Sequence, residues 1–113
     1  MFKQTNPTHL KIGRGLILRL IYLAANNNAL NPDAPTTMNK TILVMSMEDL
    51  QMLPSENDLR SNIRYLEEKG YVTADWLHDG SGDFKWVKLE PSGTDLVEGS
   101  ISDPGVLFQR RQA

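Results

Sequence analysis

Four polar residues within the segment 55–68 have the types and the spacing of side chains that contact DNA bases: Asn57, Arg60, Ser61 and Arg64. At about 100° per residue, a helix places all four on one face, opposite Leu59, Ile63 and Leu66. Arginine can donate two hydrogen bonds to guanine O6 and N7, and asparagine can make a similar pair with adenine. We therefore interpret this face as a candidate DNA-contacting surface, with Arg60 and Arg64 as its main contacts.

Three further residues are candidates for contacts with the DNA backbone. Lys40 and Thr41 stand at the start of a predicted helix, where free backbone N–H groups and the positive end of the helix dipole attract phosphate. Lys85 lies in a predicted hairpin, although Asp79 and Asp83 oppose it electrostatically. These residues complete the predicted DNA-binding set.

Other chemistry has little support in the sequence. The chain has no cysteine, which excludes disulfides and thiolate metal sites. Asp75, His78, Asp79 and Asp83 match neither EF-hand nor zinc spacing. There is no nucleophile beside a base and no glycine-rich loop between a strand and a helix. We expect no enzyme activity, no cofactor, no metal and no identifiable small-molecule ligand.

The elements that would carry these residues follow from hydrophobic periodicity and turn formers. We expect a flexible arm over residues 1–9, one domain over 10–99 and a tail over 100–113. Within the domain, helices are predicted at 10–26, 40–52, 55–69 and 91–98, with hairpin strands at 71–76 and 84–89. This is a mainly α fold with a small β-hairpin, in the winged helix-turn-helix layout.

Local signals fix several of these boundaries. Asn39 and Ser55 are good N-caps, and Gly70 suits the position after a helix where the backbone needs a positive φ. One alternative stays open for the second helix: residues 41–45 could form a strand, followed by a shorter helix from Ser46.

The hairpin carries three aromatic residues whose placement the sequence leaves open. Alternation puts Val87 and Leu89 of the second strand on the core face. Phe84 and Trp86 then share the other face, together with Lys88, and Trp76 belongs to the first strand. The aromatic residues form either an exposed patch for a partner or a surface covered by other parts of the chain.

The length and net charge of the chain further limit the class of protein it can be. A chain of 113 residues with 40% apolar content supports one compact domain. We expect neither a signal peptide nor a membrane span, and hence a cytoplasmic location. The net charge of −2 counts against a generally basic nucleic-acid binder, so binding requires a local basic face.

The stretch MNKTILVMSMEDLQMLPSENDLRSNIRYLEEKGYV, followed later by LEPSGTDLVEGS and DPGV, resembles a family of small winged-helix proteins. The family is encoded by Mu-like bacteriophages and prophages, and its members are often labelled as ArsR-type regulators. The resemblance spans residues 16–106 and implies a cytoplasmic, phage-encoded, DNA-binding protein. It does not imply metal sensing, because the cysteines of classical ArsR sensors are absent.

We therefore predict sequence-specific binding of double-stranded DNA in transcriptional control, by a homodimer formed through the first helix and the tail. The alternative is a protein–protein interaction module that lacks DNA binding, for phage assembly or host takeover. The two differ in whether Glu56, Glu67 and Glu68 neutralise the arginines of the third helix.

Overall fold

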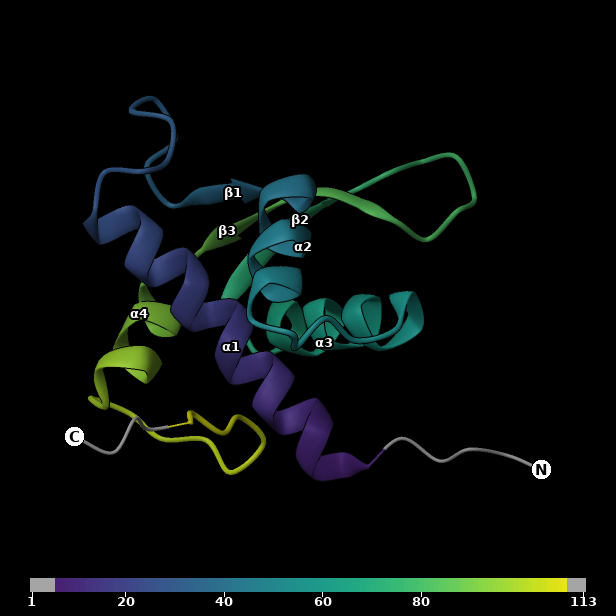
Figure 1. Ribbon diagram of the computed structural model, residues 1–113. Coiled ribbons are helices and arrows are strands. Elements are labelled where there is room, and N and C mark those ends of the chain that lie inside the picture. The colour runs from purple at the N-terminus through teal and green to yellow at the C-terminus, as the bar shows by residue number, and fades with distance from the viewer. Residues whose placement is uncertain (1–5, 110–113) are drawn as a thin grey trace.

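The computed structural model describes residues 6–109 and shows a mixed α/β fold (Figure 1). Its elements are α1 (Pro7–Asn26), β1 (Thr37–Asn39), α2 (Lys40–Asp49), α3 (Glu56–Glu68), β2 (Val72–Trp76), β3 (Phe84–Leu89) and α4 (Pro91–Glu98). The predicted order of helix, helix, helix, hairpin and helix is confirmed, with one additional strand. No helix in the described range is long and apolar enough to cross a membrane.

The first helix begins earlier than predicted. The Asn6 side chain accepts a hydrogen bond from the Thr8 backbone N–H at 2.9 Å, and Pro7 occupies the first helical position. Both are favourable at a helix start, because proline lacks the N–H that would have no partner there. The predicted arm of residues 1–9 is therefore wrong for 7–9, and residues 1–5 lie outside the described range.

The sheet contains three antiparallel strands in the order β1-β3-β2, so the predicted two-stranded hairpin was incomplete. In β1, Met38 pairs with Val87 and is buried. The alternative strand at residues 41–45 is wrong, because those residues are helical. Asn39 ends the strand and caps α2, its side chain accepting from the Ile42 N–H at 2.8 Å.

Helix α2 is shorter than the predicted 40–52. It ends at Asp49, and Gln51 then adopts a positive φ of 57°. Such a conformation is left-handed and cannot continue a right-handed helix. Residues 50–55 therefore form the turn that leads into α3.

The third helix follows the prediction closely. Ser55 caps it by accepting from the Asp58 N–H at 3.2 Å, and Gly70 follows it with a φ of 78°. Leu59, Ile63 and Leu66 are buried as expected, and they join residues of α1 and the sheet in a single core cluster. This burial fixes which face of α3 remains at the surface.

An irregularity in the hairpin places Phe84 in the core. Ala74 pairs with Val87, but Trp76 pairs with Phe84, so β3 has one residue more than β2 between these two pairs. An extra residue turns the following side chains to the opposite face of the sheet. Phe84 is buried, so its predicted outward placement is wrong.

The two tryptophans differ in their surroundings. Trp76 is half-buried against the core, its ring in edge-to-face contact with Phe84 at a centroid distance of 5.9 Å. Its indole N–H donates to Glu67 Oε1 at 2.8 Å. Trp86 is half-buried where β3 pairs with Asn39 of β1. The three aromatics therefore do not form one continuous exposed patch.

The described part of the predicted tail packs against α1. Val106 is buried, and the Leu107 N–H donates to the Lys11 carbonyl oxygen at 3.0 Å. The Arg14 side chain donates to the Gly105 carbonyl at 3.0 Å and to the buried Asn62 of α3 at 3.1 Å. Residues 103–109 are therefore part of the folded domain, and the predicted boundary at residue 99 is wrong.

A second contact anchors the same segment from the side of the hairpin. The Tyr71 hydroxyl donates to Asp103 Oδ2 at 2.7 Å. Burial, together with this hydrogen bond to a carboxylate, raises the pKa of Tyr71 to about 12. The phenol therefore keeps its proton throughout the neutral range.

We predict that Gly15→Ala destabilises the protein. A Cβ at residue 15 would overlap the carbonyl oxygen of Leu107, where the C-terminal segment crosses α1. By helix propensity alone, alanine in place of glycine would stabilise the helix by about 1 kcal/mol. Because the overlap is with backbone, we expect a net loss of about 1–3 kcal/mol in the free energy of unfolding. Urea denaturation measures this, and an equally or more stable variant would contradict the packing described.

Candidate nucleic-acid interface

The outward face of α3 carries the four predicted contact residues together. Asn57, Ser61 and Arg64 are exposed, whereas the Arg60 side chain is only 23% exposed. The start of α3 and the loop between β2 and β3 extend toward the same side of the molecule (Figure 1). The helix face and the hairpin therefore form one continuous surface.

Arg60 is bound to neighbouring groups instead of extending into solvent. Its Nη1 donates to the Ser81 carbonyl oxygen at 3.2 Å, and its Nη2 lies 3.4 Å from Glu56 Oε2. Its Nε lies 3.7 Å from Asp83 Oδ1 and, among the described atoms, is buried without a hydrogen bond. In this conformation Arg60 holds the hairpin loop against α3, so the predicted base contact by Arg60 requires it to leave these partners.

Arg64 retains more freedom. Its guanidinium lies 4.9 Å from the Trp76 ring centroid, within cation–π range, and its Nη2 makes a long hydrogen bond of 3.4 Å to the Gly82 carbonyl. A guanidinium has five N–H donors. The residue is exposed, and within the described range one of these donors makes a hydrogen bond, so most of them face solvent. Arg64 is thus oriented by the hairpin and remains available to a ligand.

Lys40 is also neutralised within the protein. Its Nζ lies 2.7 Å from Asp83 Oδ1 and 3.1 Å from Glu56 Oε2, and its side chain is 19% exposed. Partial burial works to lower the pKa of Lys40, but the hydrogen bonds to Asp83 and Glu56 outweigh it and raise that pKa. The predicted phosphate contact by Lys40 therefore requires it to leave these carboxylates.

Two of the three residues predicted to contact the DNA backbone are accessible to solvent. Thr41 is exposed in the first turn of α2, and Lys85 is exposed on β3. The structure therefore leaves these two residues and the three α3 residues exposed, whereas Arg60 and Lys40 are paired within the protein.

The acidic residue that the sequence analysis underestimated is Asp83. It was expected only to oppose Lys85, but its carboxylate lies among Lys40, Arg60 and the Phe84 backbone N–H. The hydrogen bond from Lys40, more than any other contact, lowers the pKa of Asp83. The sequence feature that could have indicated this role is the position of Asp83 directly before the strand, where a short side chain can hydrogen-bond to nearby backbone.

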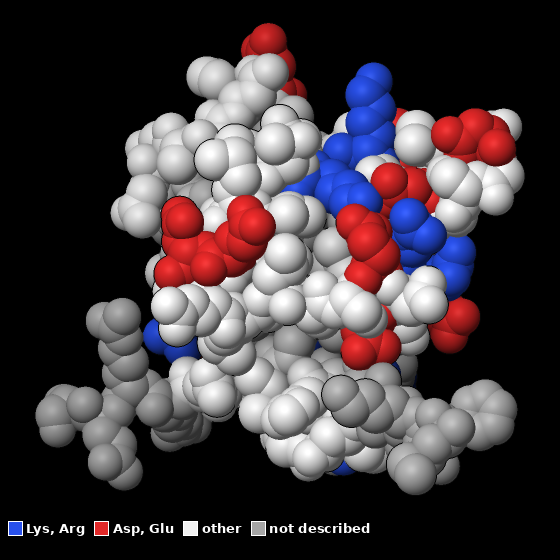
Figure 2. All heavy atoms as spheres, turned by 45° about the vertical axis from the view of Figure 1, so that its right-hand side comes forward, with Lys and Arg blue, Asp and Glu red and all other residues white. Residues whose placement is uncertain are grey.

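The glutamates of α3 behave differently from one another. Glu56 neutralises Lys40 and Arg60, as the interaction-module alternative requires. Glu67 instead accepts hydrogen bonds from the Ala74 N–H at 2.9 Å and from Trp76, so it faces the hairpin. Figure 2 shows the outcome: Lys and Arg side chains gather on one side of this face, with Asp and Glu side chains between them. The face is of mixed charge, with its acids concentrated around Lys40 and Arg60.

Within residues 6–109, no group of three or more histidines or carboxylates is arranged to hold a metal ion. His78, Asp79 and Asp83, which the sequence placed near one another, form a polar turn in which Asp79 binds the Ser81 backbone and hydroxyl. Hydrogen bonds from the Ser81 hydroxyl and N–H lower the pKa of Asp79.

Comparison with known proteins gives few matches. No protein-family model matches the chain, and no curated protein matches it. Among solved structures it is similar to the crystal structure of the circadian clock associated protein Pex from Anabaena. The identity is 19% and the TM-score 0.47, over 77% of this chain and 71% of that one. A likeness at this level carries no inference about function.

We predict that the charge cluster around Asp83 makes stability depend on acid pH. The folded pKa of Asp83 lies below its unfolded value of about 3.9. Its carboxylate therefore contributes stability that is complete above that value and is lost as the pH falls through the folded pKa. We expect Asp83→Asn to be less stable at pH 7 by up to about 1 kcal/mol and to lose less stability below pH 4.

Denaturant unfolding at a series of pH values measures this difference. Asp49→Asn is the matched control, because Asp49 is exposed and forms no ion pair within residues 6–109. Its acid profile should parallel that of the parent. If Asp83→Asn also parallels the parent, the cluster contributes nothing to the folded state.

Proposed function

We propose that the protein binds double-stranded DNA sequence-specifically as a winged helix-turn-helix domain, with α3 as the recognition helix and the β2–β3 hairpin as the wing. The observation that carries the proposal is the exposure of Asn57, Ser61 and Arg64 on one face of α3. Lys85 is also exposed, on strand β3 of the hairpin. These types are suited to base edges and phosphates.

The dimensions of α3 fit this role. Its 13 residues span roughly 20 Å, and the major groove of B-DNA, about 12 Å wide, admits one helix. With α3 in the groove, Arg64 would contact guanine or phosphate, Asn57 adenine, and Ser61 either a base or the backbone. Thr41 at the start of α2 and Lys85 on the wing would contact flanking phosphates.

Arg60 and Lys40 have a positioning role in this proposal. They connect α2 and α3 to the wing through Asp83, and so set the angle between the two surfaces that meet DNA. Glu56 is the partner that DNA would displace, because it is 58% exposed whereas Asp83 is 24% exposed. A phosphate replacing Glu56 would leave both cations paired.

A role in transcriptional control and in the cytoplasm follows from this proposal and from the resemblance to phage proteins. The phage or prophage origin stays a prediction, since no family model matches the chain.

A second candidate function is a protein-interaction module without DNA binding. The pairing of Arg60 and Lys40 with Glu56 and Asp83 favours it, because these contacts remove two cations from the face that would meet phosphate. The two candidates differ in the effect of removing Glu56: a DNA-binding protein should bind DNA more tightly, and an interaction module should gain no DNA binding.

We predict that Arg64→Ala weakens binding to duplex DNA at least about tenfold, the loss of one good contact of about 1–3 kcal/mol. Fluorescence anisotropy with a mixed-sequence duplex, followed by selection of bound sequences, measures affinity and specificity. The slope of log K against log salt should become shallower by about one. Lys69→Ala is the matched control: it also removes one positive charge from the end of α3, but near Tyr65 and Asp103, away from this face.

We also predict that Glu56→Gln strengthens binding several-fold, because it releases Lys40 and Arg60 and removes a charge that repels phosphate. The same titration at two salt concentrations tests it. If the parent shows no salt-dependent DNA binding and Glu56→Gln gains none, the interaction-module candidate is the correct one.

A further inference from the structure

Trp76, the last residue of β2, is contacted from two directions by residues one helical turn apart on α3. At its edge, the indole N–H donates to Glu67 Oε1 at 2.8 Å. At its face, the Arg64 guanidinium carbon lies 4.9 Å from the ring centroid. Residues three apart on a helix are neighbours on its surface, so both side chains can reach one ring. The tryptophan therefore links the hairpin to the outward face of α3.

Further contacts fix the ring of Trp76 in place. Glu67 Oε2 accepts from the Ala74 backbone N–H at 2.9 Å, so both oxygens of this carboxylate are engaged within the protein. The buried Phe84 ring packs against the indole in edge-to-face geometry, at a centroid distance of 5.9 Å. Because one edge is hydrogen-bonded and a second ring packs against it, the indole has little freedom to turn. Arg64 therefore meets a fixed aromatic surface.

The hairpin loop confines Arg64 from a second side. The Arg64 Nη2 donates to the Gly82 carbonyl oxygen at 3.4 Å. Gly82 has a φ of 72°, and a Cβ at this position would lie 3.2 Å from that same nitrogen. A glycine thus lets the loop approach the guanidinium closely. A cation–π contact uses the face of a guanidinium, so the donors in its plane stay free for other acceptors.

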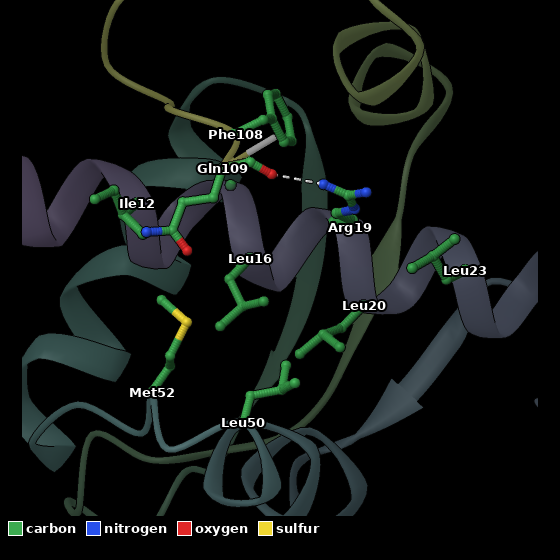
Figure 3. A pocket seen from close by; sticks show the side chains of 10 residues that line it. Ile12, Leu16, Arg19, Leu20, Leu23, Leu50, Met52, Phe108 and Gln109 are labelled. Carbon is green, nitrogen blue, oxygen red and sulfur yellow. Dashed lines mark hydrogen bonds between the residues drawn. The ribbon is translucent and has the colours of Figure 1, made fainter. Parts of the chain in front are cut away.

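An open apolar groove elsewhere in the molecule is separate from this contact. The groove lies along α1, and Figure 3 shows Leu16 and Leu20 pointing toward the same space as Leu50. Its lining comes from α1, from the end of α2 and the turn after it, and from the C-terminal segment. Neither α3 nor the hairpin contributes to it. Arg64 and Trp76 therefore belong to the surface that the proposed function assigns to DNA.

We propose that Trp76 is a positioning residue for base recognition, which holds the Arg64 guanidinium in the plane from which it donates two hydrogen bonds to guanine O6 and N7. The inference rests on the proposed function. A phosphate contact carries no sequence information and needs only a donor or a positive charge within reach. A bidentate contact with a base edge needs the planar fork in one orientation, and fixing that orientation beforehand favours binding. The confinement of Arg64 by the ring and the loop therefore points to guanine instead of phosphate.

Selection of bound sequences from a randomised duplex tests the role of Trp76. We expect the parent to enrich guanine at one position of its site. Trp76→Leu keeps an apolar side chain beside Phe84 but removes the aromatic face. It should lower that guanine preference about two- to fivefold, the size expected for an exposed cation–π contact. Trp76→Phe keeps an aromatic face and should retain most of the preference.

Trp86→Leu is the matched control for the loss of a tryptophan. Trp86 is also half-buried on the hairpin, but it lies where β3 pairs with β1, and no contact between it and Arg64 is present within residues 6–109. The variant should select the same sequences as the parent. Circular dichroism checks that each variant is folded before its selection is compared.

Two further measurements do not depend on repacking at residue 76. Arg64→Lys keeps the positive charge but lacks the planar fork, so it should lose the guanine preference while the slope of log K against log salt is unchanged. In the free parent protein, NMR should show Arg64 side-chain protons shifted upfield by the ring current of Trp76.

The outcomes separate this inference from the proposed function. A parent without salt-dependent binding to duplex DNA overturns both. If the parent binds DNA, but folded Trp76→Leu or Arg64→Lys keeps the guanine preference of the parent, only the inference fails and Arg64 is assigned to phosphate. Arg64 protons without a ring-current shift in the free parent also overturn it, because the ring then does not hold the guanidinium.

Discussion

The carboxylate of Asp83 is the contact on which the geometry of the candidate interface depends. It binds Lys40 at the start of α2, lies beside Arg60 of α3, and caps the backbone of its own strand at Phe84. Three elements that are distant in sequence are thereby held together at the base of the hairpin. A half-buried cluster of this kind loses less to screening by salt than an exposed ion pair does.

The same region shows how packing and charge act together. The extra residue in β3 turns Phe84 into the core, and the Lys40 ammonium lies 5.6 Å from the Phe84 ring centroid. Trp76 packs edge-on against Phe84 and also lies within cation–π range of Arg64. Phe84 and Trp76 therefore each lie against a basic side chain, Lys40 of α2 and Arg64 of α3 respectively.

The opposite side of α3 is fixed by a second polar network. The Arg14 guanidinium lies 3.7 Å from the Tyr65 ring centroid and bonds to Asn62 and to the Gly105 carbonyl. A buried side-chain amide is costly unless it is paired, and Asn62 is paired here. The C-terminal segment is thus attached to the helix whose other face is the proposed DNA contact.

Local signals in the chain were enough to predict the order of the helices, the caps at Asn39 and Ser55, the glycine end of α3 and its buried face. These depend on local backbone preferences and on periodicity, which neighbouring residues encode. The sequence also placed Asn57, Ser61 and Arg64 on one outward face. The pairing of β1 with β3, the inward turn of Phe84 and the packing of residues 103–109 could not be predicted in this way, because each depends on partners far along the chain. The pairing of Arg60 and Lys40 with Asp83 could not be predicted for the same reason. An arginine on a polar helix face looks the same in sequence whether it faces solvent or a carboxylate from another element.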